Sequence, residues 1–324
     1  MTKVLITGIS GQDGLFLTSK LIKTYNDVEI IGISRNSKKN FLKNLSLLNN
    51  NFDEAKIKIL NIDLLSFNDV LQLVKNFKPT SVYNLSGPSS VRKSLEENKE
   101  YKNTIIKIFD NLINSLLETH NKCNFFQASS SEFFSKNNTR KLTEKSLIEP
   151  RNPYSEAKAI NHFRCITLSE KYNWNIVSGI LFNHESEFRK DNFLIMKIIN
   201  SAFDIKNNQK NKLVLGSLNY VRDWTYAEDT VNAIFNITEN WKNNSYVIGS
   251  GNGTSIEFIV NYVFSSLELD TKNKIVIDEK YIRKSDPISI ISNPYQLKND
   301  YDWIVTYKIE QLLDKIIDYK KRTN

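Results

Sequence analysis

The chain has 324 residues, of which 40% are hydrophobic and 25% are charged, and its formal net charge is +8. This composition is typical of a globular protein, and no apolar run approaches the roughly eighteen residues of a membrane-spanning helix. The lysines are scattered among asparagines and form no basic–aromatic stripe. We therefore expect neither nucleic acid nor a membrane as a partner.

Few residues in this sequence suit a disulfide framework or a metal site. The two cysteines, Cys123 and Cys165, are too few for a framework and lie in no CxxC motif, so we expect free, buried thiols in a reducing compartment. The three histidines show no metal-ligand spacing, and we expect no metal. Residues 1–10 run straight into a strand and lack the apolar core of a signal peptide, which favours a cytoplasmic location.

The first predicted elements form a strand, a glycine-rich turn and a helix. Residues 3–14 read KVLITGISGQDG, and an amphipathic helix follows over residues 13–25. In a dinucleotide site the first glycine permits a tight turn, the second lets the backbone approach a pyrophosphate, and the third allows close helix–strand packing. The helix would aim its N-terminus at the phosphates. The predicted cofactor contacts are Gly8, Gly11, Gln12, Asp13 and Gly14.

The second predicted strand, residues 29–34, ends without an acidic residue. Folds that bind NAD usually place Asp or Glu there to hold the ribose 2′-hydroxyl. This chain offers Arg35 followed by Asn36, Ser37 and Lys38, a basic loop that is better suited to a 2′-phosphate. We predict NADP as the cofactor, with Arg35 as a contact and NAD as the alternative.

Strands and helices alternate over the first half of the chain. We expect strands over residues 56–64, 80–86 and 124–128, and helices over residues 66–77 and 98–119. This alternation predicts an α/β fold with a doubly wound parallel sheet, in which ligands lie beyond the carboxyl ends of the strands. Predicted ligand contacts at these ends are Asp63, Leu64 and Leu85 for the cofactor and Ser89 for the substrate.

Residues 127–158 carry the candidate catalytic groups. The strand over residues 124–128 runs into SSSE, which contains Ser130 and Glu132, and Pro153 then opens a helix over residues 153–172. Tyr154 and Lys158 lie four residues apart and so share one face of that helix. A nearby cation favours the phenolate, so Tyr154 could take a proton from a sugar hydroxyl, assisted by Ser130. The alternative is an ordinary surface pair, but Tyr154 is the one tyrosine of fourteen with a lysine four residues on.

The second half of the chain predicts a smaller lobe. We expect a strand at 174–183, a helix at 191–205, and further strands and helices at 212–216, 227–240, 245–249, 255–267, 274–278 and 308–320. Our domain prediction is a Rossmann domain over residues 1–180, to which residues 212–250 return. Residues 181–324 then form mainly an interleaved α/β substrate lobe.

The sequence resembles the extended short-chain dehydrogenase/reductases, the NAD-dependent epimerase/dehydratase superfamily, and within it the GDP-mannose 4,6-dehydratase family. The likeness covers nearly the whole chain and is carried by GISGQDG (8–14), FFQASSSE (125–132), NPYSEAK (152–158), GILFNHES (179–186) and VRDWTYAED (221–229). It implies an NADP-dependent lyase, a hydro-lyase of nucleotide-sugar biosynthesis. Its product would be a 4-keto-6-deoxy sugar nucleotide made from GDP-mannose, another GDP-hexose or a GDP-heptose.

The resemblance also implies roles for residues. Tyr154 would deprotonate the sugar 4-hydroxyl, Glu132 would remove the C5 proton, and Lys158 would orient the ribose and lower the pKa of Tyr154. Ser130 stands where the family usually has threonine. The implied substrate contacts are Asn183, His184, Lys197, Arg222 and Arg283.

Some features of the sequence leave alternatives open. A C4 reductase or epimerase would use the same tyrosine and lysine, and a dinucleotide-binding protein without catalysis would keep the glycine turn. The family's NHESPRRG loop reads NHESEFRKD here, with Glu187 and Phe188 in place of Pro and Arg. That loop serves NADP binding and tetramer assembly in the family, so we expect either a homodimer or a homotetramer.

Overall fold

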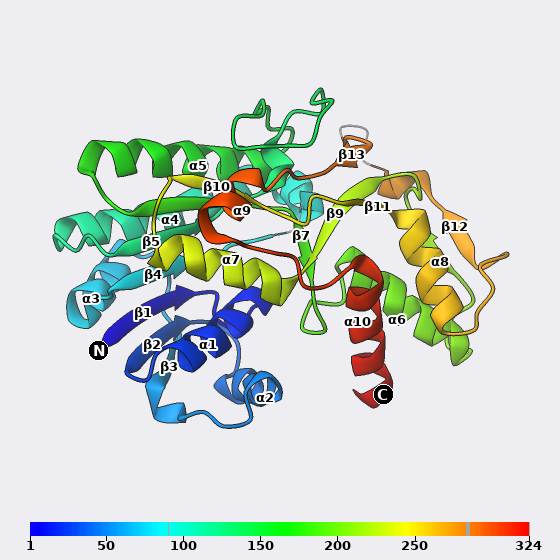
Figure 1. Ribbon diagram of the computed structural model, residues 1–324, viewed down its shortest axis with the longest axis horizontal. Coiled ribbons are helices and arrows are strands. Elements are labelled where there is room, and N and C mark those ends of the chain that lie inside the picture. The colour runs from blue at the N-terminus through cyan, green and yellow to red at the C-terminus, as the bar shows by residue number, and fades with distance from the viewer. Residues whose placement is uncertain (90, 283–285, 324) are drawn as a thin grey trace.

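The computed structural model describes residues 1–89, 91–282 and 286–323. Its centre is a seven-stranded sheet with the strand order β10-β6-β5-β4-β1-β2-β3, and every neighbouring pair in it is parallel (Figure 1). The strands are β1 (Thr2–Thr7), β2 (Val28–Ile33), β3 (Ile57–Leu60), β4 (Ser81–Asn84), β5 (Asn124–Ala128), β6 (Ile176–Leu181) and β10 (Ser245–Ile248). The predicted doubly wound α/β fold is confirmed.

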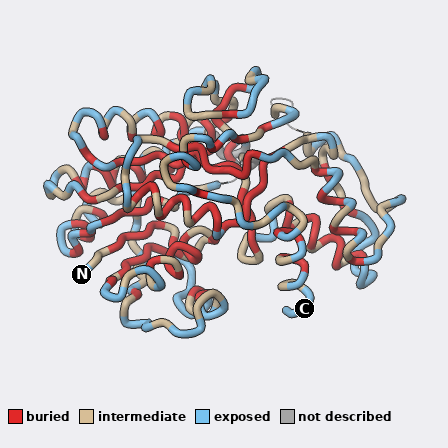
Figure 2. The backbone as a smooth tube through the Cα atoms, in the orientation of Figure 1, coloured by how far each residue is buried: buried red, intermediate tan, exposed pale blue. Residues whose placement is uncertain are grey.

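Helices cover both faces of this sheet because its strands are apolar on both sides. In β1, Val4 and Ile6 join one buried cluster, whereas Leu5 between them joins another. The first cluster includes side chains of α1 (Gln12–Thr24), α2 (Lys38–Leu48) and α7 (Ala227–Glu239). The second includes side chains of α3 (Phe67–Phe77), α4 (Val91–Glu118) and α5 (Pro153–Tyr172). Figure 2 shows buried backbone running through the sheet between these two layers.

The predicted helix at 153–172 coincides with α5 because both of its ends are encoded locally. The Asn152 side chain accepts from the Ser155 amide at 2.9 Å, and the Ser155 hydroxyl accepts from the Asn152 amide, which completes a capping box. Pro153 occupies the first turn, where no backbone N–H is needed. The helix ends at Asn173, whose backbone is left-handed with φ 44°. The start of α4 was placed less well: it begins at Val91, seven residues before the predicted position.

A second lobe lies beside the carboxyl ends of the main sheet (Figure 1). Its larger sheet has the order β11-β9-β13, and β7 pairs with β9, while β8 pairs with β12. The strands are β7 (Asn183–Glu185), β8 (Leu213–Leu215), β9 (Val221–Tyr226), β11 (Gly253–Ser255), β12 (Ile275–Ile277) and β13 (Ser289–Ile290). The helices of this lobe are α6 (Leu194–Lys206), α8 (Ile256–Ser266) and α10 (Ile309–Thr323), and η3 (Glu279–Tyr281) is a short 3₁₀ turn. The main domain also contains α9 (Tyr295–Tyr301), which contacts β10 and α7, and the 3₁₀ turns η1 (Glu54–Lys56) and η2 (Ser131–Phe133).

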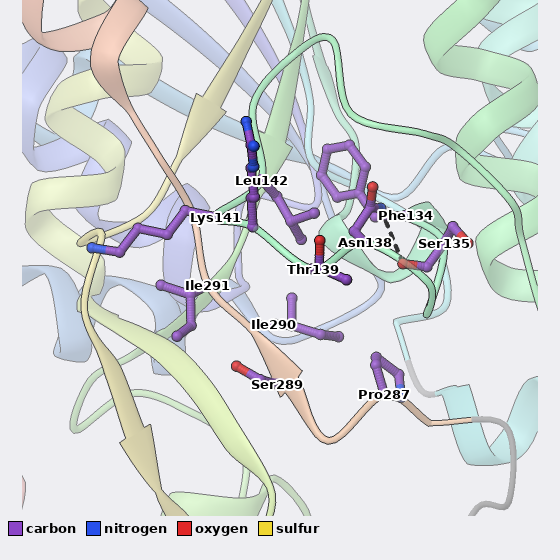
Figure 3. A pocket seen from close by; sticks show the side chains of 11 residues that line it. Phe134, Ser135, Asn138, Thr139, Lys141, Leu142, Pro287, Ser289, Ile290 and Ile291 are labelled. Carbon is purple, nitrogen blue, oxygen red and sulfur yellow. Dashed lines mark hydrogen bonds between the residues drawn. The ribbon is translucent and has the colours of Figure 1, made fainter.

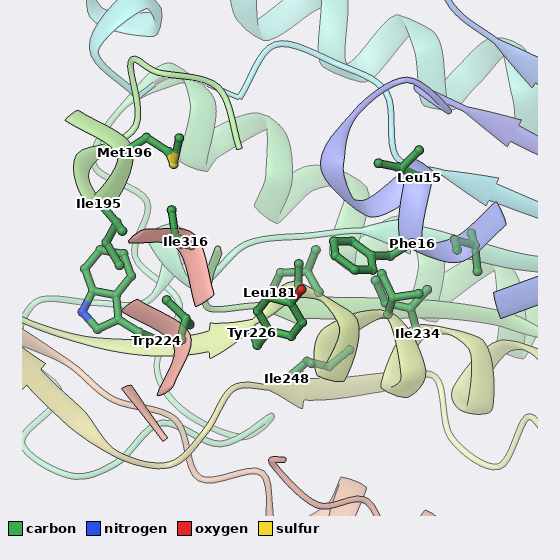
Figure 4. Close-up of a cluster of buried hydrophobic side chains, with 14 of the residues drawn as sticks. Leu15, Phe16, Leu181, Ile195, Met196, Trp224, Tyr226, Ile234, Ile248 and Ile316 are labelled. Atoms are coloured by element: carbon green, nitrogen blue, oxygen red, sulfur yellow. The ribbon is translucent and has the colours of Figure 1, made fainter. Parts of the chain in front are cut away.

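One continuous apolar core joins the lobe to the main sheet. Phe16 of α1 and Tyr226 of β9 pack edge to face with ring centroids 5.6 Å apart, and Ile316 of α10 belongs to the same cluster (Figure 4). The predicted strand at 174–183 is divided here: β6 ends at Leu181, and β7 leaves the main sheet to pair with β9. This crossover places the residues of β7 where both sheets meet.

The sequence also leads to expectations about disulfides, membrane-spanning helices and metal sites. Cys123 and Cys165 are both buried free thiols. Within residues 1–89, 91–282 and 286–323, no helix is long and apolar enough to cross a membrane, and no cluster of three potential metal-ligating side chains occurs.

Candidate active site

The glycine turn after β1 has the close packing that a dinucleotide site needs. Gly8 has φ +74°, and a Cβ there would lie 3.1 Å from the backbone of Leu85. A Cβ on Gly14 would lie 2.5 Å from Ile9 Cα, so the helix approaches the strand only because no side chain intervenes. Gly11 caps α1 without any side-chain hydrogen bond, which leaves the first N–H groups of the helix available to a ligand. These features fit a pyrophosphate.

Two serines that the sequence analysis did not single out lie beside this turn. Ser10 Oγ and Ser34 Oγ are 2.6 Å apart, and Asn36 donates to both of them, from its side chain to Ser10 at 3.0 Å and from its backbone to Ser34 at 2.9 Å. They lie at the end of β2, where the ribose end of a dinucleotide is bound in such folds. Arg35 is exposed at the same strand end. Ser10 could have been noticed from the sequence as a hydroxyl inside the glycine turn.

The remaining predicted cofactor and turn residues also lie at strand ends. Asp63 accepts from the Leu65 amide at 2.9 Å just beyond β3, and the Leu64 carbonyl accepts from Asn111 of α4 at 2.9 Å. Leu85 follows β4 and is half-buried, while Ser89 is exposed in the next turn. All four positions therefore face the same edge of the sheet as the glycine turn.

Tyr154 and Lys158 are buried side by side at the start of α5. Lys158 donates from Nζ to the Ala128 carbonyl at the end of β5, 2.7 Å away, and the same ammonium lies 5.7 Å from the centre of the Tyr154 ring. The side chain of Lys158 is 7% exposed, and that of Tyr154 is 8% exposed. This tyrosine–lysine pair is thus a feature of the interior and not a surface pair.

The expectation that Lys158 lowers the pKa of Tyr154 is not met. Burial raises the pKa of Tyr154 to about 12, although the Ser130 side chain and the charge of Arg189 act in the opposite direction. Burial also lowers the pKa of Lys158 to about 8. The physical reason is that desolvation disfavours both charged forms, while the ammonium is directed at a carbonyl and not at the phenol.

Ser130 and Glu132 reach the same place from the end of β5. The strand runs into η2, where Ser130 Oγ accepts from the Glu132 amide at 3.3 Å. The Ser130 side chain acts to lower the pKa of Tyr154 and the charge of half-buried Glu132 acts to raise it, so both groups lie near the phenol. The structure therefore brings Ser130, Glu132, Tyr154 and Lys158 together.

His184 is placed differently from the substrate contact that we expected. It is 7% exposed in β7, and its ring nitrogens lie 2.8 Å from the Phe182 carbonyl and 3.0 Å from the Asp13 carboxylate. Asn183, the preceding residue, is half-buried and is aligned with Trp224 of β9. The histidine thus joins the second lobe to the start of α1.

The other predicted substrate contacts lie in the second lobe and are engaged with the chain itself. Lys197 donates to the Val214 carbonyl at 2.7 Å and lies 4.7 Å from the centre of the Tyr281 ring. Arg222 is 8% exposed, donates to the Ile288 carbonyl at 3.3 Å and lies 3.7 Å from Asp286. The predicted Arg283 lies outside the described residues.

A cavity of about 200 Å³ has none of the substrate contacts described above among the described residues that line it. It lies between the loop that follows η2 and the segment around β13, with Phe134 and Leu142 on one side and Ser289 to Ile291 on the other (Figure 3). Its lining includes none of Ser130, Glu132, Tyr154 and Lys158, so this cavity is not the candidate catalytic site.

Comparisons with known proteins agree with this arrangement. The family model of GDP-mannose 4,6 dehydratase matches residues 5–316. GDP-mannose 4,6 dehydratase 2 of Arabidopsis thaliana is 29% identical over 320 residues, covering 97% of this chain and 85% of that protein. GDP-mannose 4,6 dehydratase of Homo sapiens is 29% identical over 343 residues, covering 97% of this chain and 90% of that protein.

Solved structures share the fold at lower identity. The dTDP-glucose 4,6-dehydratase of Bacillus anthracis in complex with NAD superposes with a TM-score of 0.84 at 18% identity, covering 100% of this chain and 98% of that one. RMD of Pseudomonas aeruginosa complexed with NADPH gives a TM-score of 0.79 at 18% identity, with 98% of each chain covered. Since the family model spans nearly the entire sequence, the chain belongs to the GDP-mannose 4,6-dehydratase family.

Proposed function

We propose that the protein is an NADP-dependent GDP-mannose 4,6-dehydratase that converts its substrate to the 4-keto-6-deoxy sugar nucleotide. One observation carries the proposal: Ser130, Glu132 and Tyr154 meet at the end of β5, in a chain matched by this family along most of its length. A hydroxyl, a carboxylate and a phenol at one point supply the two proton transfers that such a dehydration needs.

Tyr154 acts on the sugar 4-hydroxyl, with the Ser130 hydroxyl nearby. The raised pKa of Tyr154 keeps the phenol protonated at neutral pH, so its action as a base requires added positive charge nearby. When bound, oxidised NADP supplies that charge together with a reversible hydride acceptor. The Ser130 hydroxyl can donate to the same sugar oxygen.

Glu132 removes the proton from C5, which a ketone at C4 makes acidic, and passes it to the C6 hydroxyl, which leaves as water. Return of the C4 hydride to C6 and of a proton to C5 would complete the 6-deoxy sugar. The carboxylate suits this step because it lies in the short η2 turn and is only half-buried, so it can reach a ligand at the strand end. Lys158 braces α5 against β5 through the Ala128 carbonyl and thereby fixes the position of Tyr154.

The dinucleotide would be held at the carboxyl edge of the main sheet. Its pyrophosphate would lie at the start of α1 and its ribose end near Ser10, Ser34 and Arg35. NADP is the proposed cofactor, and the same residues could hold NAD. Residues 1–180 with the return over 212–250 would form this half, and residues 181–324 would supply most of the substrate lobe.

The substrate nucleotide would lie against the second lobe. Arg222 and Lys197 are the cations that we propose for the diphosphate or nucleoside, since each is held there by backbone carbonyls. Both also have partners within the chain, so substrate binding would exchange or share those contacts. A homodimer or homotetramer is the proposed assembly.

A panel of sugar nucleotides tests this assignment. Purified protein with NADP is incubated with GDP-mannose, a GDP-heptose, and UDP-, CDP- and dTDP-hexoses, and the products are identified by mass spectrometry. We expect loss of one water from GDP-mannose without net consumption of cofactor. A product of unchanged mass would indicate an epimerase. A product lighter by two hydrogens, with one NADPH formed per product, would indicate a C4 reductase running in reverse. Loss of water only from another donor would indicate a different substrate.

A further inference from the structure

Four buried or half-buried charged side chains of alternating sign lie where α1 begins beside β7. The Asp13 carboxylate faces His184 at 3.0 Å, and Arg189 Nε lies 3.3 Å from the carboxylate of Glu185, the next residue of β7. The Arg189 guanidinium also stacks 3.6 Å from the centre of the Phe193 ring. Asp13 belongs to the glycine turn proposed for the cofactor, and the other three come from the second lobe.

Both ring nitrogens of His184 face acceptors. Nδ1 lies 2.8 Å from the Phe182 carbonyl, and Nε2 lies 3.0 and 3.1 Å from the two oxygens of Asp13. A neutral imidazole has only one N–H, whereas an imidazolium has two and satisfies both acceptors. Burial alone would lower the pKa of His184, yet the Asp13 carboxylate raises it above its usual value. Burial acts to raise the pKa of Asp13, but His184 chiefly, with Arg189 and Gln12, lowers it to about 2.

Hydrogen bonds of neutral groups surround this pair and fix its geometry. Gln12 donates to the His184 carbonyl at 3.2 Å and to Asp13 at 3.2 Å, and the Ser186 hydroxyl donates to Gln12 at 2.8 Å. The charged groups acting on His184 are therefore Asp13 from α1 and Arg189 from the loop after β7, with Glu185 paired to that arginine. The Asp13–His184 pair is therefore held in place by Gln12 from α1 and by Ser186, which follows β7 and is bonded to Gln12.

We propose that His184 is a positioning residue whose imidazolium neutralises Asp13 and so keeps the N-terminus of α1 receptive to an anionic pyrophosphate. An unpaired carboxylate in the first turn would compete for the positive end of the helix and repel a phosphate group placed there. It would also disfavour the phenolate, because the charge of Asp13 already acts to raise the pKa of Tyr154. The role of His184 is thus exerted through Asp13 and not through contact with the sugar.

Binding of NADP to the full chain, measured by titration calorimetry without substrate, tests this proposal. His184→Gln keeps a neutral donor but removes the charge, and we expect it to raise the Kd by about tenfold. The double variant Asp13→Asn with His184→Gln removes both charges and should recover most of that affinity. The matched control is His162→Gln, because His162 is a buried histidine that is hydrogen-bonded to Ser178 at 2.9 Å and has no carboxylate partner. Its Kd should stay unchanged.

The protonation state of His184 can also be measured directly in the wild-type chain, so this test does not require a variant that folds. The chain has three histidines, so ¹⁵N NMR of histidine-labelled protein can follow each ring. We expect His184 to carry protons on both nitrogens at neutral pH, whereas a neutral His184 ring would overturn the proposal. So would a double variant that binds NADP no better than His184→Gln, since a purely structural latch would lose more with each change. If the wild-type chain binds neither NADP nor NAD, the proposed function fails first and this inference fails with it.

Discussion

The Lys158 ammonium donates to the carbonyl of Ala128 across 2.7 Å and so ties the second turn of α5 to the last residue of β5. The contact holds Tyr154 next to the strand end that carries Ser130 and Glu132. Because the ammonium is buried, its pKa falls to about 8, near enough to neutrality for the group to exchange a proton during turnover.

Replacing Tyr154 with phenylalanine should lower kcat by at least about a thousandfold, because the phenol is the group that exchanges a proton with the sugar. Calorimetric binding of NADP should change little, since the aromatic ring remains. Tyr172→Phe, at the other end of α5, is the matched control and should retain full activity. A Tyr154→Phe enzyme with ordinary turnover would exclude the proposed base.

Glu132→Gln should separate oxidation from elimination. We expect the exchange of the C5 proton with solvent deuterium to fall by about a hundredfold or more, because the amide cannot accept that proton. Reduced cofactor should still form transiently. Glu156→Gln on α5, a half-exposed carboxylate paired with Lys102, should behave as wild type. Normal C5 exchange in the Glu132 variant would assign the proton transfer to another group.

The ion pair of Asp13 predicts a specific dependence of stability on pH. Its folded pKa of about 2 lies below the ordinary 3.8, so its contribution is complete above about pH 4 and disappears as the pH falls toward 2. The free energy of unfolding of wild type should therefore exceed that of Asp13→Asn at pH 5, and the difference should shrink below about pH 4. A difference that is independent of pH over this window would rule out the ion pair as its cause.

Phe188, one of the departures from the family loop, packs inside its own chain. Its ring lies 5.7 Å from that of Phe16 and 5.8 Å from that of Tyr319. Phe188→Ala should lower the free energy of unfolding in urea by about 2 kcal/mol through lost burial. Phe163→Ala, at a side chain that is 52% exposed, should cost less than about 1 kcal/mol. Equal costs would contradict the observed packing of the loop.

Asp223 should be among the least tolerant positions outside the catalytic cluster. It is 1% exposed and accepts from the backbone amides of Ser250, Gly251 and Ser292 and from the hydroxyls of both serines. Asp223→Ala should destabilise the fold by about 3 kcal/mol, because those donors lose their acceptor. Thermal unfolding measures the effect, and a near-neutral change would mean that water replaces the carboxylate.

The elements predicted best from the sequence are those with local signals. The strand over 124–128 and the helix over 153–172 were placed without error, because Pro153 and Asn152 encode the start of that helix. The convergence of the glycine turn and the SSSE strand end followed from one rule, that parallel strands end at the same edge of a sheet.

What escaped prediction depends on contacts between distant residues. Nothing local shows that the strand after Trp174 breaks at Phe182, because β7 forms only by pairing with β9 about forty residues later. The position of His184 likewise depends on Asp13, 171 residues earlier. The family resemblance implies that His184 contacts the substrate, whereas in the structure its ring faces Asp13 of the glycine turn.

The central claim is that one pocket oxidises, dehydrates and reduces a single sugar ring. GDP-mannose labelled with deuterium at C4 tests it most directly when it is incubated with the wild-type chain and a catalytic amount of NADP. The account predicts a product lighter by one water that carries the deuterium at C6. Deuterium lost to solvent, retained at C4, or accumulated in reduced cofactor would contradict it.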